Sequence, residues 1–131
     1  MGHMLEVLVA SSDSEHCQIL ATILGHCGLM PVLCSSLKEA QTLLGRESIR
    51  LVFCEQQLTG GSFRDLLQAT SNVRPGLPLV VFSRRDDSKL HSEAIQLGAS
   101  DCIGPPFHHR QIEGIVHKAL LPAPPRTGTR G

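Results

Sequence analysis

Short apolar segments alternate with amphipathic helical segments along almost the whole chain, and this alternation limits the fold to a few arrangements. Nearly continuous aliphatic runs are typical of strands in a parallel sheet whose two faces are both covered by helices. The predicted strands are Leu5–Ala10, Met30–Cys34, Ile49–Cys54, Leu79–Phe82 and Asp101–Ile103. Between and after them, apolar residues recur at helical spacing. The sequence therefore predicts an α/β fold in which five strands alternate with five helices.

Right-handed crossovers between parallel strands leave few ways to arrange these elements. We expect the doubly wound, flavodoxin-like (βα)5 sandwich, whose five-stranded parallel sheet has the order 2-1-3-4-5. Capping residues support the predicted helix starts. Ser12 with Glu15, and Ser36 with Glu39, have the spacing of a capping box, and Ser62 precedes the third helix.

The length of 131 residues fits one domain. Residues 1–3 precede a second methionine and are interpreted as a cloning remnant. Residues 4–121 form the predicted domain, and residues 122–131 are rich in Pro and Gly, which indicates a tail or linker.

Charge and composition exclude several classes of partner. The 12 Lys and Arg residues equal the 12 Asp and Glu residues, so no overall positive charge attracts nucleic acid. No apolar run approaches the ~20 residues that cross a membrane. The five cysteines show no CxxC spacing, which indicates reduced, buried thiols and neither disulfides nor a zinc site. We therefore expect a cytoplasmic domain that binds neither nucleic acid nor membrane.

Glu55 is the most informative polar residue, because it follows the third apolar run and precedes a Gly-containing turn. It therefore lies at the carboxyl edge of the predicted sheet, where open α/β folds place their ligand sites. The neighbouring strand ends carry Ser11 and Ser12, Ser83, and the Gly-Pro-Pro segment 104–106. One acid without a second carboxylate or a lysine is a poor catalytic site, so we do not expect an enzyme.

Four segments carry a resemblance to a known family: residues 8–13, 51–60, 79–83 and 98–107. In the last and most specific one, a helix ending in Gly-Ala is followed by an acid, a short strand and Pro-Phe. Together these segments resemble the receiver domain of two-component response regulators. The resemblance covers residues 4–121. Several of the family's functional residues are replaced in this chain, so it resembles the degenerate, pseudo-receiver type.

The resemblance implies a role for each strand end. In receiver domains an acidic pair after the first strand holds Mg²⁺, and an Asp after the third strand accepts a phosphoryl group. This chain has Ser11, Ser12 and Glu55 at those positions. The family's hydroxyl residue after the fourth strand is kept as Ser83, whereas Pro105 stands where the family has a lysine.

These replacements should stop the family's chemistry. Phosphoryl transfer to a carboxylate depends on charge neutralisation, which hydroxyls and a proline do not supply. We therefore expect no phosphorylation, no bound Mg²⁺ and no other cofactor. Asp13 is either a residual metal ligand or a favourable negative charge at the start of the first helix. Cys102 replaces the aromatic switch residue that the family often has in its fifth strand.

Two interpretations of Glu55 remain open. Its side chain is one methylene longer than Asp, so its carboxylate could mimic a phosphoryl group. Alternatively, it is a drifted surface acid in an inactive pocket. We favour the second interpretation, because a carboxylate carries about one charge against nearly two for a phosphate, and because the lysine partner is absent.

Two further clusters contain charged or ionisable residues. Residues 84–87, Arg-Arg-Asp-Asp, are interpreted as a solvated loop that neutralises its own charge, although their position beside Ser83 leaves an anion site open. His108, His109 and His117 are not expected to bind metal, because the adjacent pair points to different faces of the last helix.

The resulting hypothesis is an atypical receiver domain that is not phosphorylated and acts as a protein-interaction or regulatory module in bacterial signalling. By family resemblance, it would meet a histidine kinase, an output domain or a second copy through the fourth helix, fifth strand and fifth helix. Candidate contact residues there are Gln96, Asp101, Arg110 and Glu113. The alternatives are a receiver that is phosphorylated at Glu55 with residual Mg²⁺, and a small-ligand binder, which would need a Gly-rich loop that the first strand lacks.

Overall fold

The computed structural model describes residues 5–84 and 88–120. Its main sheet has five parallel strands in the order β2-β1-β3-β6-β7. Since β4 and β5 form a separate small hairpin, this confirms the predicted order 2-1-3-4-5. The main strands are β1 (Glu6–Ala10), β2 (Met30–Cys34), β3 (Ile49–Glu55), β6 (Leu79–Phe82) and β7 (Asp101–Ile103).

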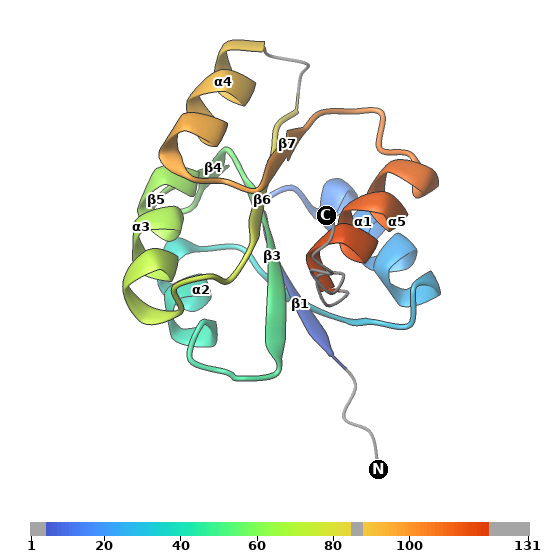
Figure 1. Ribbon diagram of the computed structural model, residues 1–131, viewed down its shortest axis with the longest axis horizontal. Coiled ribbons are helices and arrows are strands. Elements are labelled where there is room, and N and C mark those ends of the chain that lie inside the picture. The colour runs from blue at the N-terminus through green and yellow to red at the C-terminus, as the bar shows by residue number, and fades with distance from the viewer. Residues whose placement is uncertain (1–4, 85–87, 121–131) are drawn as a thin grey trace, which may run out of the picture.

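Five helices cover the sheet on both faces (Figure 1). One face carries α1 and α5, and the other carries α2, α3 and α4. The helices are α1 (Ser14–His26), α2 (Leu37–Leu43), α3 (Phe63–Val73), α4 (Ser88–Leu97) and α5 (His109–Leu120). The predicted α/β sandwich is therefore confirmed for the described residues.

The central strand β1 shows how the sequence produces two cores. Successive side chains of a strand point to opposite faces, so Leu8 and Ala10 pack under α2 and α3, whereas Val7 and Val9 pack under α1 and α5. All four are fully buried. A strand buried on both faces needs apolar residues at every position, which explains why these runs do not alternate with polar residues.

The helix starts follow the predicted caps with one correction. Ser36 and Ser62 are the N-caps of α2 and α3, as expected. The cap of α1 is Asp13 and not Ser12, because the Asp13 carboxylate accepts the backbone N–H groups of Glu15 and His16. Asp, like Ser, is a favoured cap residue, and its charge adds a favourable interaction with the helix N-terminus.

The turn after Glu55 contains structure that the sequence pattern did not predict. β4 (Gln57–Leu58) and β5 (Gly61–Ser62) form a two-stranded antiparallel hairpin. Gly60 in its turn has a φ of 91°, a conformation that glycine adopts without steric cost. The hairpin leads directly into α3.

The five cysteines form no disulfide in the structure, and four of them are buried, which confirms the predicted burial. Burial raises the pKa of Cys34 to about 12, and it also raises the pKa of Cys54. These thiols therefore stay protonated and unreactive at neutral pH. Among the described residues, no helix combines the length and apolar character needed to cross a membrane. The predicted remnant 1–3 and tail 122–131 lie outside the described residues.

Candidate functional site

Three central strands end together at one edge of the sheet, as the parallel topology requires. Glu55 is the last residue of β3 and is paired in register with Phe82 of β6. Ser11 follows β1 directly, and Ser83 follows β6. Each of Ser11, Glu55 and Ser83 is 3% exposed. The structure therefore forms a buried polar cluster at the carboxyl ends of these strands.

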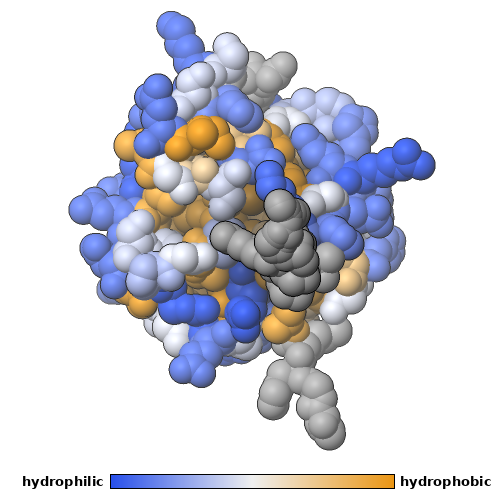
Figure 2. All heavy atoms as spheres, viewed as in Figure 1, coloured by the Kyte–Doolittle hydropathy of each residue, from blue (hydrophilic) through white to orange (hydrophobic). Residues whose placement is uncertain are grey.

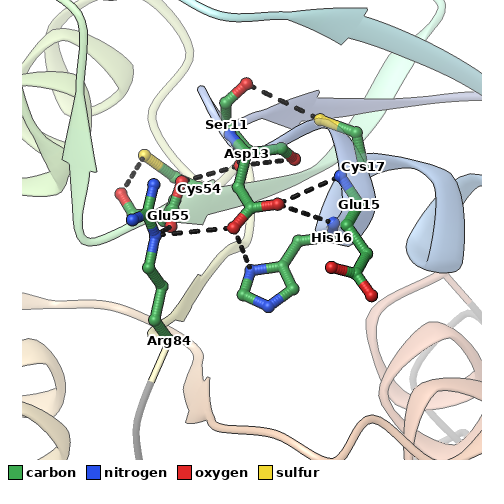
Figure 3. A network of polar contacts seen from close by, with 8 residues as sticks. All are labelled: Ser11, Asp13, Glu15, His16, Cys17, Cys54, Glu55 and Arg84. Atoms are coloured by element: carbon green, nitrogen blue, oxygen red, sulfur yellow. Dashed lines mark hydrogen bonds and ion pairs between the residues drawn. The ribbon is translucent and has the colours of Figure 1, made fainter.

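Both oxygens of the Glu55 carboxylate accept a hydrogen bond (Figure 3). The Ser11 hydroxyl donates to Oε1 at 2.7 Å, and the Nε–H of Arg84 donates to Oε2 at 2.9 Å. This corrects the interpretation of Glu55 as a surface acid. A carboxylate with so little exposure needs partners of this kind, because an unpaired buried charge is strongly unfavourable.

Arg84 provides the positive charge of the site. Its Nε lies 2.9 Å from Glu55 Oε2 and 3.5 Å from Asp13 Oδ2, so one guanidinium faces two carboxylates. The hydrogen bond to Glu55 is the main reason that the pKa of Arg84 is raised. The prediction that the loop 84–87 neutralises itself is therefore wrong for Arg84, and residues 85–87 lie outside the described part of the chain.

Asp13 links this cluster to the start of α1. Its Oδ1 accepts the backbone N–H of Glu15 at 3.0 Å and of His16 at 3.2 Å, while its Oδ2 faces Arg84. These contacts hold the pKa of Asp13 below its usual value, with the backbone hydrogen bond from His16 as the largest cause. The Ser11 hydroxyl accepts the Asp13 N–H at 3.0 Å, so Ser11 ties the helix cap to Glu55.

His16 is a member of the cluster that the sequence analysis missed. Its ring packs edge-on against Phe107 and Phe82, with ring centres 5.2 and 6.1 Å apart. Its Nδ1 is 3.7 Å from Asp13 Oδ2 and is buried without a hydrogen bond. The sequence offered one signal, since His16 lies three residues after Asp13 and therefore on the same side of the helix start.

The cluster has the residue types of a metal site but already contains a cation. One ligand atom each from Asp13, His16 and Glu55 lies within 4.8 Å of the other two, and this is the only such group of three among residues 5–84 and 88–120. Mg²⁺ prefers an octahedral set of oxygen ligands, whereas this group offers a nitrogen. Arg84 neutralises both carboxylates, which lowers the attraction of the site for a divalent ion.

The remaining positions that the resemblance singled out contribute no charge. Ser12 is exposed, and the buried Ser83 donates its backbone N–H to Ile103 O at 3.1 Å. Pro105 is half-buried, and its bond to Pro106 is cis. Cys102 is buried in β7, at 8% exposure.

The described residues also line a groove away from this site. It has a volume of about 440 Å³ and lies between the end of α3, the loop 76–78 and α5. Figure 2 shows apolar residues gathered in the middle of this face between hydrophilic residues. The guanidinium of Arg74, at its edge, already donates to the carbonyls of Leu44, Arg46 and Ile49.

The chain matches the model of the response regulator receiver domain over residues 7–117, and it belongs to this family. It is 23% identical over 116 residues to the transcriptional regulatory protein ZraR of Escherichia coli, a match that covers 88% of this chain and 26% of that protein. It is 25% identical over 115 residues to the response regulator protein PilR of Pseudomonas aeruginosa, with the same two coverages of 88% and 26%. The chain thus spans about a quarter of these relatives.

Solved structures agree with this assignment. The receiver domain of NtrX from Brucella abortus superimposes with a TM-score of 0.80 at 26% identity, covering 87% of this chain and 97% of that one. A putative response regulator from Chloroflexus aurantiacus gives a TM-score of 0.83 at 18% identity, with coverages of 90% and 98%. The second likeness concerns the fold alone. The protein is therefore a receiver domain of the two-component response regulator type.

Removing the Ser11 hydroxyl should destabilise the domain measurably. In Ser11→Ala, a buried carboxylate oxygen of Glu55 loses its donor, and hydrogen bonds to charged groups contribute about 1.5–3 kcal/mol. Urea unfolding of the variant should therefore give a free energy of unfolding lower by about this amount. The exposed neighbour serves as control, since Ser12→Ala should change stability by less than about 0.5 kcal/mol. Equal effects of the two substitutions would contradict the assigned contact.

Proposed function

We propose that this receiver domain is not phosphorylated and acts as a protein-interaction module. The observation that supports this most strongly is that the carboxylate of Glu55 is already occupied. Both of its oxygens accept hydrogen bonds from side chains of the domain, and its charge is paired with Arg84. A phosphoryl group would have to break these bonds and enter a site with 3% exposure.

The distribution of charge around Glu55 also opposes the chemistry. Attack of a carboxylate on a phosphoryl group brings negative charges together, and catalysis requires cations placed on the transferred oxygens. Arg84 is the cation here, but it lies on the Glu55 carboxylate itself and so reduces its nucleophilicity. Pro105 provides no donor at the position where the family resemblance implies a lysine.

The pairing with Arg84 supports the interpretation of Glu55 as part of an inactive pocket over that of a phosphoryl mimic. A mimic would present its negative charge to the rest of the domain, whereas here the charge is compensated within 2.9 Å. We infer that Glu55, Ser11 and Arg84 form a structural lock that closes the site at the ends of β1, β3 and β6, and that the face formed by α4, β7 and α5 does not depend on the charge of Glu55. The conformational equilibrium of the domain then no longer depends on a phosphodonor.

The proposed interaction face consists of α4, β7 and α5. Gln96, Arg110 and Glu113 are exposed on its helices, and Asp101 at the start of β7 is half-buried, so all four are accessible to a partner. A bidentate ion pair between Arg64 and Glu93, at 2.6 Å for both bonds, ties α4 to α3 and limits movement of the face. The proposed partners are a histidine kinase, an output domain of the same protein or a second copy, in the cytoplasm of a bacterium. The proposed domain carries no enzymatic activity and binds no nucleic acid.

Two opposite changes at Glu55 test this proposal. Beryllofluoride with Mg²⁺ supplies a phosphoryl analogue, whereas Glu55→Gln keeps the shape of the side chain and removes its charge. The proposal predicts that beryllofluoride leaves the melting temperature unchanged, because ligands stabilise only a state that they bind. It also predicts that Glu55→Gln changes the self-association constant, measured by sedimentation, by less than about threefold.

Each readout has a contradicting result. A dose-dependent rise of the melting temperature that disappears in Glu55→Gln would favour the alternative of a receiver that accepts phosphate at Glu55. A change of about tenfold or more in self-association, equivalent to about 1.4 kcal/mol, would show that Glu55 acts as a mimic.

A further inference from the structure

Two histidines that are far apart in the sequence face each other where α1 and α5 meet. His26 is the last residue of α1, and His109 is the first residue of α5. Nδ1 of His26 lies 3.5 Å from Nε2 of His109, while the ring centres are 5.3 Å apart and the ring planes differ by 23°. The two nitrogens therefore lie on the facing edges of the rings. Both residues are exposed.

We propose that His26 and His109 form a binding site for a divalent transition-metal ion such as Zn²⁺. Histidine nitrogens bind Zn²⁺ at about 2.0–2.1 Å in tetrahedral geometry, which corresponds to a separation of roughly 3.3 Å between two ligand nitrogens. The observed 3.5 Å needs little adjustment to reach that value. Exposure on the surface gives the ion access and leaves room for water as further ligands.

An acidic residue lies one helical turn from His109. Glu113 follows His109 by one helical turn, so both residues lie on the same side of α5. Its negative charge contributes, after burial, to the raised pKa of the Cys27 thiol, and Cys27 directly follows His26 in the sequence. Glu113 can therefore add negative charge near an ion held by the two imidazoles, while water supplies the remaining ligands.

The position of the site gives it a consequence for the domain. An ion bound there would join the end of α1 to the beginning of α5, two elements that pack together on one face of the sheet (Figure 1). It lies apart from the Glu55 cluster and uses none of its residues, so this inference does not depend on the absence of phosphorylation. The expectation that His109 has no metal partner considered only the histidines of its own helix, whereas His26 comes from α1.

Zinc titration of the wild-type protein and three histidine variants tests the site. The variants are His26→Ala, His109→Ala and, as a matched control, His117→Ala, which removes an exposed histidine from the same helix α5. Isothermal titration calorimetry gives the dissociation constant, and thermal melts at tenfold excess over this constant give the stabilisation. Wild type and His117→Ala should bind one Zn²⁺ and melt about 5 °C higher with the ion.

His26→Ala and His109→Ala should each weaken Zn²⁺ binding by at least tenfold and lose the rise in melting temperature. Because both side chains are exposed, both variants should keep the melting temperature of the ion-free wild type within about 2 °C. The proposal is overturned if wild type binds Zn²⁺ with a dissociation constant above ~1 mM, the limit of a weak site. It is equally overturned if binding persists in both variants, or if His117→Ala loses it to the same extent.

Discussion

Replacing Arg84 with Gln is expected to create a divalent-cation site that the wild-type domain does not offer. The carboxylates of Asp13 and Glu55 and the Nδ1 of His16 would remain close together, within 4.8 Å, but would lose their neutralising guanidinium. At about 4 Å, even with the dielectric constant of water, the repulsion between one positive charge and a doubly charged ion is large enough to change affinity by tenfold or more. Calorimetric titration with Mn²⁺ should therefore show at least tenfold tighter binding in Arg84→Gln than in wild type.

The same variant should be less stable in the absence of metal, because the buried carboxylate of Glu55 would lose its counter-charge. Added Mn²⁺ should restore part of the lost melting temperature. The control is Arg110→Gln, which removes an exposed arginine from α5 and leaves the Glu55 cluster intact. If Arg84→Gln and Arg110→Gln bind Mn²⁺ with equal affinity, Arg84 does not act as an internal cation.

A larger change is expected when the side chains implied by the family resemblance are restored. The variant carries Ser11→Asp, Ser12→Asp, Glu55→Asp and Pro105→Lys, together with Arg84→Gln to remove the internal cation. It should be phosphorylated by a small phosphodonor in the presence of Mg²⁺. Single preorganised donors contribute about 100- to 1,000-fold to rates, so the variant should react at least about a hundredfold faster than wild type.

Glu55→Asp alone should stay unreactive, because it supplies the acceptor without the metal ligands or the lysine. Circular dichroism melts of both variants separate loss of folding from loss of reactivity. A folded five-substitution variant that reacts no faster than wild type would mean that the proposed replacements are not what prevents the chemistry.

The fold could be predicted from the sequence because nearly every residue of its strands is apolar. A central strand such as β1 is buried on both faces, so each side chain from Val7 to Ala10 must be apolar. Such a run, followed by a capping residue and a helical period, leaves few topologies. The hairpin of β4 and β5 was not predicted, since strands of two residues carry no periodicity.

The site was predicted in its location but not in its chemistry. Parallel topology alone brings the ends of β1, β3 and β6 together, so Ser11, Glu55 and Ser83 could be grouped from their positions. The direction of Arg84 could not be found in this way, because a long side chain leaving a loop can reach several partners. The sequence pairs Arg84 with its neighbouring acids at 86 and 87, whereas the structure places its guanidinium against the carboxylates of Asp13 and Glu55.

His26 and His109 illustrate a similar limit. They are separated by 83 positions, and nothing local relates the end of α1 to the start of α5. Only the packing of both helices on the same face of the sheet brings the two rings together. Sequence periodicity compares residues within one element, so it considered His109 only with the histidines of the last helix and missed the contact between elements.

The central claim is that the Glu55 site is closed to phosphoryl transfer, and intact-mass spectrometry tests it most directly. The wild-type domain and the five-substitution variant would be incubated side by side with acetyl phosphate and Mg²⁺. The structure predicts an unchanged mass for wild type and one added phosphoryl group for the variant. A phosphoryl group on the wild-type domain, mapped to Glu55 by fragmentation, would contradict the proposed lock of Ser11, Glu55 and Arg84.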